Sequence, residues 1–423
     1  MSSARRDWRP QLTVMLANTR KASAEASQCS AAFKKKVLLD IASRIEKKTA
    51  WLLRENQKDV AGAKAAGLSS AMIDRLTLTG KRIKVMADGV RTVAGLKDPI
   101  GKVQAKWTRP NGLRLQKVTV PLGVILMIYE SRPNVTVECA ALCLKSSNVA
   151  ILRGGREAMA SNRAFVTIFR ASLKRHGLLP FHINLVTTTD YAAVDFLLVQ
   201  EGKIDLVIPR GGEKLIRRVV EKSRIPVIKH YQGICHVYVD KKADLKKAVS
   251  IAINAKLQRP GVCNAMETLL VHKGIAAKFL PAVGIPLKAG GCEIRGDAVT
   301  RRYLPWAKPA KASDFGREFL ERILAVRVVK NTAEAIRHIE TYGSRHTDAI
   351  VTEDKNAADI FKAKVDSSSV MVNASTRFSD GFEYGFGAEI GISTDKIHAR
   401  GPMGLEGLTS YKYIVEGNGQ VRT

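Results

Sequence analysis

The sequence lacks any apolar run long enough to cross a bilayer. A membrane-spanning helix needs roughly 18 consecutive, mostly apolar residues, whereas the longest apolar stretch here, Val118 to Tyr129, contains Pro121 and Gly123. That stretch predicts a buried strand instead. With 423 residues, 45% of them hydrophobic and 26% charged, the chain is typical of a globular protein of two domains with no membrane partner.

Cysteine is scarce, and its spacing is irregular. The six cysteines are Cys29, Cys139, Cys143, Cys235, Cys263 and Cys292. No two of them form a Cys-x-x-Cys pair, so neither a zinc site nor a disulfide framework is indicated, and we expect no metal. Reduced thiols are typical of the cytosol, and we therefore expect a cytoplasmic protein.

Acidic residues are too few to balance the basic ones. The chain has 69 Lys and Arg against 39 Asp and Glu, a formal charge of +30, and only 6% aromatic residues. Such a charge can indicate a nucleic-acid-binding protein, which is the non-enzymatic alternative. Because the basic clusters are short and broken by apolar residues, we favour a solvated basic surface without a nucleic-acid partner. That surface would still attract an anionic small substrate.

The hydrophobic pattern changes near residue 118. From Leu12 to about Leu96 apolar residues recur at helical spacing, and Asp74 to Val93 predicts an amphipathic helix that Gly80 can interrupt. Residues 99–112 have the composition of a loop. Beyond them, short apolar strands alternate with helices, which predicts an α/β fold with parallel sheets covered on both faces.

This alternation gives the expected elements. Strands are expected at 118–129, 148–152, 183–187, 206–209, 227–229, 235–239, 267–272, 323–329, 348–352 and 370–374. Helices after residue 118 are expected at 136–144, 157–173, 248–257, 333–340 and 357–364. The tail at 410–419 alternates with period two, which predicts a strand or hairpin.

The usual dinucleotide fingerprint, Gly-x-Gly-x-x-Gly after a strand, is missing. Two shorter turns follow expected strands, Arg153-Gly154-Gly155 and Arg210-Gly211-Gly212. Each combines glycines for close backbone approach with an arginine suited to phosphate. Each alone could be a plain turn, but open α/β sheets bind ligands at the carboxyl ends of their strands, which favours a phosphate-containing ligand here.

One cysteine, Cys263, stands in the polar turn Gln258-Arg-Pro-Gly-Val-Cys-Asn-Ala, between an expected helix and an expected strand. A thiolate is a strong nucleophile, and the nearby Arg259 would favour its ionisation. The alternative is a small residue that packs a turn, which is the commoner role of a free cysteine.

Longer motifs identify a family. They include Tyr129-Glu-Ser-Arg-Pro-Asn-Val-Thr, Gly233-Ile-Cys-His-Val-Tyr-Val-Asp, the turn of Cys263, Val372-Asn-Ala-Ser-Thr-Arg-Phe and His398-Ala-Arg-Gly-Pro-Met-Gly-Leu-Glu. From roughly residue 12 to the end, the chain resembles the gamma-glutamyl phosphate reductases, also called glutamate-5-semialdehyde dehydrogenases, of the aldehyde dehydrogenase superfamily.

The resemblance implies an aldehyde dehydrogenase-like α/β fold in three parts. They are an NADPH-binding, Rossmann-like domain at 1–110 and 128–233, to which the chain returns at 381–408, a catalytic domain at 234–380, and oligomerisation β segments at 111–127 and 409–423. It also implies a homodimer or homotetramer. Because glutamyl phosphate cyclises readily and this chain shows no kinase domain, a transient contact with glutamate 5-kinase is a further hypothesis.

The resemblance also implies a reaction, in which NADPH reduces L-glutamyl 5-phosphate to L-glutamate 5-semialdehyde and phosphate, the second step of proline biosynthesis from glutamate. Cys263 stands where the family has its nucleophile, which forms a thioester. The amide of Asn134 and the backbone N–H of Cys263 would stabilise the oxyanions. The alternative for Asn134 is a turn or cap residue before a helix at Thr136.

Further positions follow from the same resemblance. The cofactor-binding residues would be Arg153, Gly154, Arg210, Gly211, Gly212 and Glu318. Arg153 replaces a superfamily lysine near the adenosine ribose, where a cation suits a 2′-phosphate. Glu318 would hold the nicotinamide ribose, although an exposed helix carboxylate is an equal alternative.

The substrate carries anionic groups, and four residues of matched motifs suit them. They are Arg259, Arg377, Ser375 and Thr376, two cations and two hydroxyl donors. Hydrolytic aldehyde dehydrogenases, the enzymatic alternative, carry a glutamate base where this chain has Lys229-His-Tyr-Gln-Gly, without a carboxylate. That absence favours the acyl-phosphate reaction. The family commonly has an acidic residue where Gln232 stands.

Overall fold

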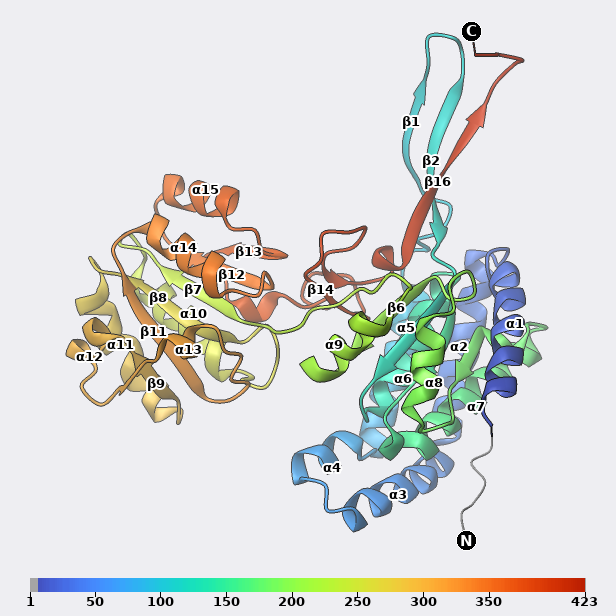
Figure 1. Ribbon diagram of the computed structural model, residues 1–423, viewed down its shortest axis with the longest axis horizontal. Coiled ribbons are helices and arrows are strands. Elements are labelled where there is room, and N and C mark those ends of the chain that lie inside the picture. Colours follow the sequence, from blue (N-terminus) through green and yellow to red (C-terminus); the bar gives the residue numbers. More distant parts are fainter. Residues whose placement is uncertain (1–6, 423) are drawn as a thin grey trace. The chain divides into compact units, whose positions relative to one another are not determined.

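The computed structural model describes residues 7–422 and divides into two compact units (Figure 1). Unit 1 comprises Met1–Lys229, Phe386–Gly391 and Met403–Thr423, and unit 2 comprises His230–Gly385 and Ile392–Pro402. Residues 1–6 and 423, which the expected cofactor and oligomerisation parts include, lie outside the described residues. Within the described part, none of the helices combines the length and the apolar character that a membrane span requires.

Unit 1 begins with the expected helical region. Its helices are α1 (Arg9–Ala26), α2 (Ala31–Lys47), α3 (Thr49–Ala65), α4 (Ser70–Leu76) and α5 (Gly80–Gly95). The expected interruption near Gly80 is a true break, because the hydroxyl of Thr79 accepts a hydrogen bond from the N–H of Arg82 and caps a new helix.

A four-stranded parallel sheet follows in unit 1. In the order β5-β4-β3-β6, its strands are β5 (Ile183–Leu185), β4 (Val149–Arg153), β3 (Val124–Tyr129) and β6 (Leu206–Arg210). The connecting helices are α6 (Pro133–Lys145), η1 (Arg156–Ala158), α7 (Met159–Arg175), η2 (Pro180–His182), α8 (Tyr191–Leu198) and α9 (Glu213–Lys222). The strand order reverses between β3 and β6, and such a switch point is where open α/β sheets bind ligands.

Two strand expectations for unit 1 are wrong. The stretch 227–229 makes only an isolated bridge from Val227 to Val207. The run 118–129 is two strands rather than one, because Gly123 has φ +121° and breaks it. A side chain at Gly123 would also overlap the carboxylate of Asp205, so this bend requires glycine.

A three-stranded antiparallel sheet, which we call the arm, completes unit 1 (Figure 1). In the order β1-β2-β16, it consists of β1 (Val103–Thr108), β2 (Arg114–Pro121) and β16 (Thr409–Glu416). The strand expected in the tail is confirmed as β16, whereas the loop expected at 99–112 is wrong. Val103, Ala105 and Trp107 alternate with polar residues there, a period-two signal that the sequence analysis missed, although all six residues of β1 are exposed.

Unit 2 is built on a seven-stranded parallel sheet, in the order β10-β9-β11-β8-β7-β12-β13. Its strands are β7 (Cys235–Val239), β8 (Met266–His272), β9 (Glu293–Gly296), β10 (Lys308–Pro309), β11 (Ile323–Val329), β12 (Thr347–Val351) and β13 (Ser369–Val372). Its helices are α10 (Leu245–Leu257), α11 (Ala276–Ala289), α12 (Ala298–Tyr303), α13 (Ala312–Phe315), α14 (Thr332–Tyr342), α15 (Lys355–Lys364) and η3 (Thr376–Phe378). The remaining short elements of the chain are β14 (Gly391–Ser393), β15 (Gly401–Met403) and, in unit 1, η4 (Glu406–Leu408).

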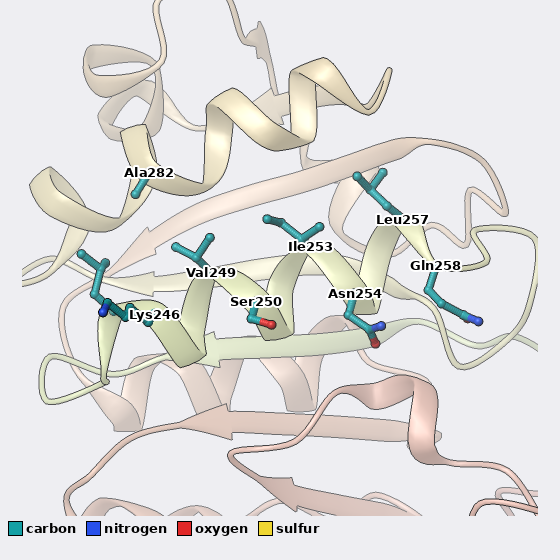
Figure 2. Close-up of a pocket in the computed structure, with 9 residues that line it drawn as sticks. Lys246, Val249, Ser250, Ile253, Asn254, Leu257, Gln258 and Ala282 are labelled. Atoms are coloured by element: carbon teal, nitrogen blue, oxygen red, sulfur yellow. The ribbon is translucent and has the colours of Figure 1, made fainter.

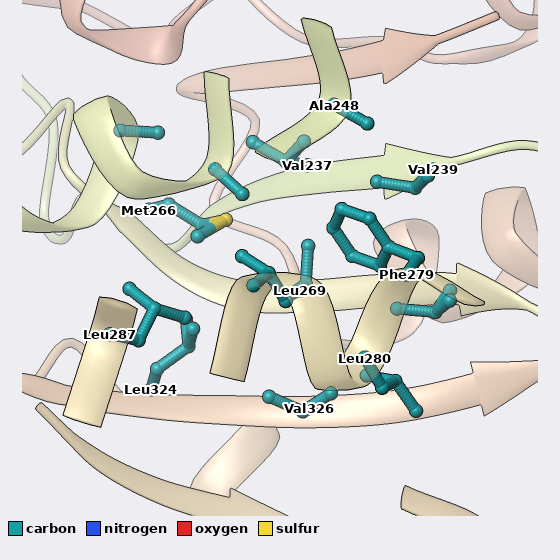
Figure 3. Close-up of a cluster of buried hydrophobic side chains, with 14 of the residues drawn as sticks. Val237, Val239, Ala248, Met266, Leu269, Phe279, Leu280, Leu287, Leu324 and Val326 are labelled. Carbon is teal, nitrogen blue, oxygen red and sulfur yellow. The ribbon is translucent and has the colours of Figure 1, made fainter. Parts of the chain in front are cut away.

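One face of this sheet is covered by α10 and α11, whose apolar side chains point toward those of β7, β8 and β11 (Figure 3). Phe279 and Leu269 are completely buried there, as is Val237. Burying one such side chain stabilises the fold by about 1.5–3 kcal/mol. The core therefore holds α10 and β8 rigidly, and the turn that carries Cys263 joins these two elements.

Candidate active site

Cys263 lies, as the sequence predicts, in the turn between α10 and β8, and it is half-buried. A side chain at Gly233 would overlap the carbonyl oxygen of Cys263, so the two backbones touch. The thiol of Cys235 donates a hydrogen bond to the same carbonyl, with sulfur and oxygen 3.2 Å apart. The backbone of the cysteine is therefore fixed from the side of β7.

Two histidines share the surroundings of Cys263. One ring nitrogen of His230, one of His346 and the sulfur of Cys263 all lie within 4.8 Å of one another. The two rings meet edge to face, with centroids 5.5 Å apart. Burial, and then the neighbouring His230, lower the pKa of His346 to about 3, so its imidazole is neutral at pH 7. Sequence reasoning missed His346, which immediately precedes β12 and is distant from Cys263 along the chain.

The substrate residues expected from the motifs gather beside this turn. The side-chain amide of Asn264 donates to the carbonyl of Ser379 at 2.9 Å, and Nε of Arg377 donates to Oε1 of Gln258 at 2.8 Å. Burial, and then the charge of Arg259, lower the pKa of Arg377. Residues on both sides of Cys263 are thus tied to the loop at 375–379.

The hydroxyl residues of that loop have different surroundings. The Oγ of Ser375 accepts a hydrogen bond from the N–H of Arg377 at 3.3 Å. The hydroxyl of Thr376 is buried without a partner among the described residues. Both side chains are buried, so they shape the loop from inside, and direct contact with a substrate stays a prediction.

Glu318 lies in the same unit as Cys263, between α13 and β11. Its carboxylate accepts the backbone N–H of Gly233 at 2.9 Å. The side chain is half-buried and is not on a helix, so the alternative of an exposed helix carboxylate is wrong. Its role toward a cofactor stays a prediction.

In unit 1, Arg153 ends β4 and is buried, with 7% of its surface exposed. Its guanidinium lies 5.0 Å from the ring centroid of Tyr191, and Arg218 approaches the same ring at 5.1 Å. The Nε of Arg153 is buried and has no hydrogen-bond partner within residues 7–422. Two cations around one ring, one of them with an unsatisfied donor, suit a phosphate group.

The glycines of the two expected phosphate turns are needed for packing. A side chain at Gly154 would overlap Asn162, and one at Gly211 would lie 2.8 Å from Oε1 of Glu130. The N–H of Gly212, at the start of α9, donates to that same oxygen of Glu130 at 2.8 Å. Glu130, which sequence reasoning missed, therefore occupies a donor that a pyrophosphate would use.

Asn134 lies in the first turn of α6, because the helix begins at Pro133 rather than near Thr136. Arg132 is the residue before the helix, so the reading of Asn134 as a cap is wrong. The amide nitrogen of Asn134 donates to Oε1 of Glu138 at 3.0 Å. Proline at the first helical position explains the early start.

A separate groove runs along α10 (Figure 2). Its walls are largely apolar, with Val249, Ile253 and Leu257 pointing into it from one helix. None of the described residues that line it is a cysteine, a histidine or a carboxylate. The turn of Cys263 is therefore the better candidate for chemistry.

Comparison with known proteins gives consistent matches. The model of the aldehyde dehydrogenase family matches residues 7–288. The chain is 55% identical to a gamma-glutamyl phosphate reductase of Carboxydothermus hydrogenoformans, over 95% of this chain and 97% of that protein. It is 54% identical to the protein of the same name from Desulfatibacillum aliphaticivorans, over 96% of this chain and 97% of that one.

Solved structures agree with these matches. The crystal structure of gamma-glutamyl phosphate reductase from Thermotoga maritima is similar with a TM-score of 0.96 and 44% identity, over 97% of this chain and 100% of that chain. A glyceraldehyde-3-phosphate dehydrogenase from Methanocaldococcus jannaschii, complexed with NADP, is similar with a TM-score of 0.68 and 17% identity, over 97% of this chain and 95% of that one, which shows the fold alone. The expected aldehyde dehydrogenase-like α/β fold is confirmed.

Proposed function

Since this chain belongs to the aldehyde dehydrogenase family, and within it to the gamma-glutamyl phosphate reductases, we propose that it reduces L-glutamyl 5-phosphate to L-glutamate 5-semialdehyde and phosphate with NADPH. This reaction is the second step of proline biosynthesis from glutamate. The observation that carries the proposal is the turn of Cys263, fixed by Gly233 and placed next to Arg259 and Arg377. A thiol among cations suits an anionic acyl phosphate.

The Cys263 thiolate would attack the acyl carbon of glutamyl phosphate. A carbon–sulfur bond forms, the carbon–oxygen bond to phosphate breaks, and phosphate leaves with the bonding electron pair. The product is a thioester on Cys263. The oxyanion that develops during the attack needs donors, for which the backbone N–H of Cys263 and the amide of Asn134 are our candidates.

Several residues of unit 1 fit NADPH. Arg153 and Arg218, whose guanidinium groups lie 5.0 and 5.1 Å from the ring centroid of Tyr191, would hold the 2′-phosphate, because the buried Nε of Arg153 lacks a partner in the described part of the chain. The turn from Arg210 through Gly211 to Gly212, together with Gly154, would receive the pyrophosphate in place of the carboxylate of Glu130, which accepts the N–H of Gly212 in this structure. Glu318 of unit 2 would hold the nicotinamide ribose. When bound, NADPH supplies the hydride that reduces the thioester to the aldehyde. Cys263 is then released as the thiolate.

The hydrolytic alternative would require a carboxylate base beside the thioester. The stretch from Lys229 to Gly233 contains none, and the carboxylate that reaches it, Glu318, already accepts the N–H of Gly233. We therefore favour transfer to phosphate over transfer to water.

The arm is our candidate for assembly into a homodimer or homotetramer. Trp107, Tyr411 and Tyr413 are exposed on it, and apolar surface of this kind commonly marks protein interfaces. A transient contact with the kinase that makes glutamyl phosphate is a further hypothesis. Co-purification at low salt would test it, and separate elution at every salt concentration would remove it.

The function is tested by following semialdehyde oxidation with NADP and with NAD, each with and without phosphate. We expect turnover that requires phosphate and prefers NADP. The variant Cys263→Ala should lose turnover while it keeps NADPH binding. Phosphate-independent formation of free glutamate would favour the hydrolytic alternative, and full activity of the variant would refute the thioester.

A further inference from the structure

Three side chains that bind transition metals meet at one edge of the seven-stranded sheet. Cys263 precedes β8, His230 precedes β7, and His346 immediately precedes β12. These strands are parallel neighbours in the order β8-β7-β12, so their amino ends lie side by side. The ligand atoms of the three residues lie within 4.8 Å of one another.

From this geometry we propose that Cys263, His230 and His346 bind one zinc ion, and that the bound ion blocks the Cys263 thiolate. Metal binding rests on the geometry alone. The blocking effect rests in addition on the proposed function, in which Cys263 is the nucleophile.

The two histidines are oriented as metal ligands usually are, with one ring nitrogen held by a hydrogen bond to the protein. Nδ1 of His230 lies 2.9 Å from the carbonyl oxygen of Ile392, and Nδ1 of His346 lies 2.9 Å from the hydroxyl of Thr347. The carbonyl, which only accepts, requires the proton of His230 on Nδ1 and leaves the lone pair on Nε2, and the hydroxyl of Thr347, which can accept or donate, is compatible with the same tautomer of His346.

The second nitrogen of His346 is the stronger sign of a missing ligand. Its Nε2 is buried and finds no hydrogen-bond partner anywhere in residues 7–422, and the whole side chain is inaccessible to solvent. A buried nitrogen without a partner costs free energy, which a metal bond would remove.

The ligand types select the ion. Thiolate and imidazole suit zinc, whereas magnesium and calcium prefer oxygen ligands. Tetrahedral zinc, with bonds of about 2.0 Å to nitrogen and 2.3 Å to sulfur, separates its ligands by roughly 3.3 to 3.8 Å. The three side chains would thus close by about 1 Å. Three protein ligands leave a fourth position for water.

Coordination of zinc converts the thiol of Cys263 into a metal-bound thiolate. The thiol of Cys263 releases its proton to solvent, and a sulfur lone pair forms the bond to zinc. That electron pair is then no longer available to attack an acyl carbon. Removal of the ion by a chelator, with return of a proton or binding of substrate, restores the free thiol.

No zinc motif is recognisable in the sequence because the three ligands come from three separate segments. The ligands belong together only once β7, β8 and β12 are paired in the sheet. Spacing rules for zinc sites detect ligands that are close along the chain, and Cys263 and its two histidines are not.

The test uses the full chain, freed of metal and kept reduced, and titrated with zinc or cobalt(II). Bound metal is counted by elemental mass spectrometry. Cobalt bound to a thiolate is recognised by its sulfur-to-metal charge-transfer absorption. We expect one ion per chain, a charge-transfer band, and loss of activity that a chelator reverses.

Variants then assign the ligands. Cys263→Ala should abolish the charge-transfer band, and His230→Asn and His346→Asn should each weaken binding by at least about tenfold. Two histidine variants are used because His346 is buried and its replacement can impair folding. His272→Asn is the matched control, since His272 lies at the opposite end of β8 and should leave metal binding unchanged.

The outcomes separate this proposal from the proposed function. Absence of stoichiometric metal, or a band that persists in Cys263→Ala, would overturn the zinc site and leave the function untouched. Metal bound through Cys263 in an enzyme that keeps full turnover would overturn both the blocking effect and the role of Cys263 as nucleophile.

Discussion

Lys256 and Glu267 form an ion pair with Nζ and Oε2 2.6 Å apart, and both side chains are fully buried. Lys256 stands on α10 and Glu267 on β8, so the pair ties together the two elements that the turn of Cys263 connects. The other oxygen of Glu267 accepts the N–H of Leu320 at 3.1 Å. Burial raises the pKa of Glu267 to about 7, and the charge of Lys256 opposes that rise.

Removal of one member of this ion pair should lower the free energy of unfolding. Lys256→Met leaves the carboxylate of Glu267 buried without its partner, and we expect a loss of about 3–5 kcal/mol in the free energy of unfolding. The double variant Lys256→Met, Glu267→Leu removes both polar groups and should be closer to the parent in stability than Lys256→Met. Urea unfolding of the parent, Lys256→Met, Glu267→Leu and the double variant measures this, and additive losses would contradict it.

A side chain at Gly233 should displace the nucleophile. Gly233→Ala introduces an atom that overlaps the Cys263 carbonyl, so the turn must shift, and a shift of about 1 Å can lower the rate about 100-fold. We expect kcat/KM to fall by that order. At Gly261, in the same turn, an added Cβ would meet the carbonyl oxygen of Leu320 at an ordinary 3.6 Å. Gly261→Ala is therefore the matched control, and an equal loss in both variants would contradict this account.

Replacement of Arg153 should affect the two cofactors differently. Loss of a hydrogen bond to a charged group costs about 1.5–3 kcal/mol, so Arg153→Ser should weaken NADPH binding by roughly 10- to 100-fold. NADH, which lacks the 2′-phosphate, should bind nearly as before. Fluorescence titration measures both affinities. Arg156→Ser, at an exposed arginine of the same turn, serves as the control, and equal losses for NADPH and NADH would show that Arg153 does not read the phosphate.

Stability should fall in mild acid because of His338. Burial, followed by the charges of His236 and Arg327, lowers the pKa of His338 to about 3, and the ring of Tyr342 packs against it. In the unfolded chain this histidine binds a proton near pH 6.5, whereas in the folded chain it stays neutral down to about pH 3. Its contribution to the stability of the fold is therefore complete above pH 6.5 and is lost as the pH falls toward 3.

For this histidine alone, the loss between pH 6.5 and pH 5 is about 2 kcal/mol. The parent and His338→Gln are compared by urea unfolding at pH 7 and at pH 5. The variant is expected to be less stable at pH 7 but to lose less on acidification. A pH dependence as steep as that of the parent would show that His338 is not the group responsible.

The sequence predicts elements well where the local pattern is strong. The strands at Cys235–Val239 and Ile323–Val329 have the expected bounds, because they are apolar runs interrupted only by His236 and Arg327, respectively. The helix α11 was not expected, since it contains Pro281 and Pro286, which normally argue against a helix interior. Its apolar face is buried against the sheet, and this tertiary packing outweighs the local signal.

The residues of the candidate active site likewise fall into those that a local motif predicts and those that it does not. Cys263 and its turn are recognisable because the whole motif is contiguous, and Arg377 because its loop matches a family motif. Glu130 and His346 were missed, since each acts through a partner that is distant along the chain. Gly233 belongs to a recognised motif, but its tight approach to Cys263 depends on the pairing of β7 with β8.

The arm has a consequence for the order in which the protein folds during its synthesis. Its third strand, β16, follows all of unit 2 along the chain, and it pairs with β2, which is translated far earlier. A ribosome has therefore synthesised all of unit 2 before unit 1 can be completed. Until then one edge of β2 is open, and nascent chains with open edges are prone to pair with one another. Termination of translation before β16 should accordingly yield insoluble protein rather than a shortened enzyme.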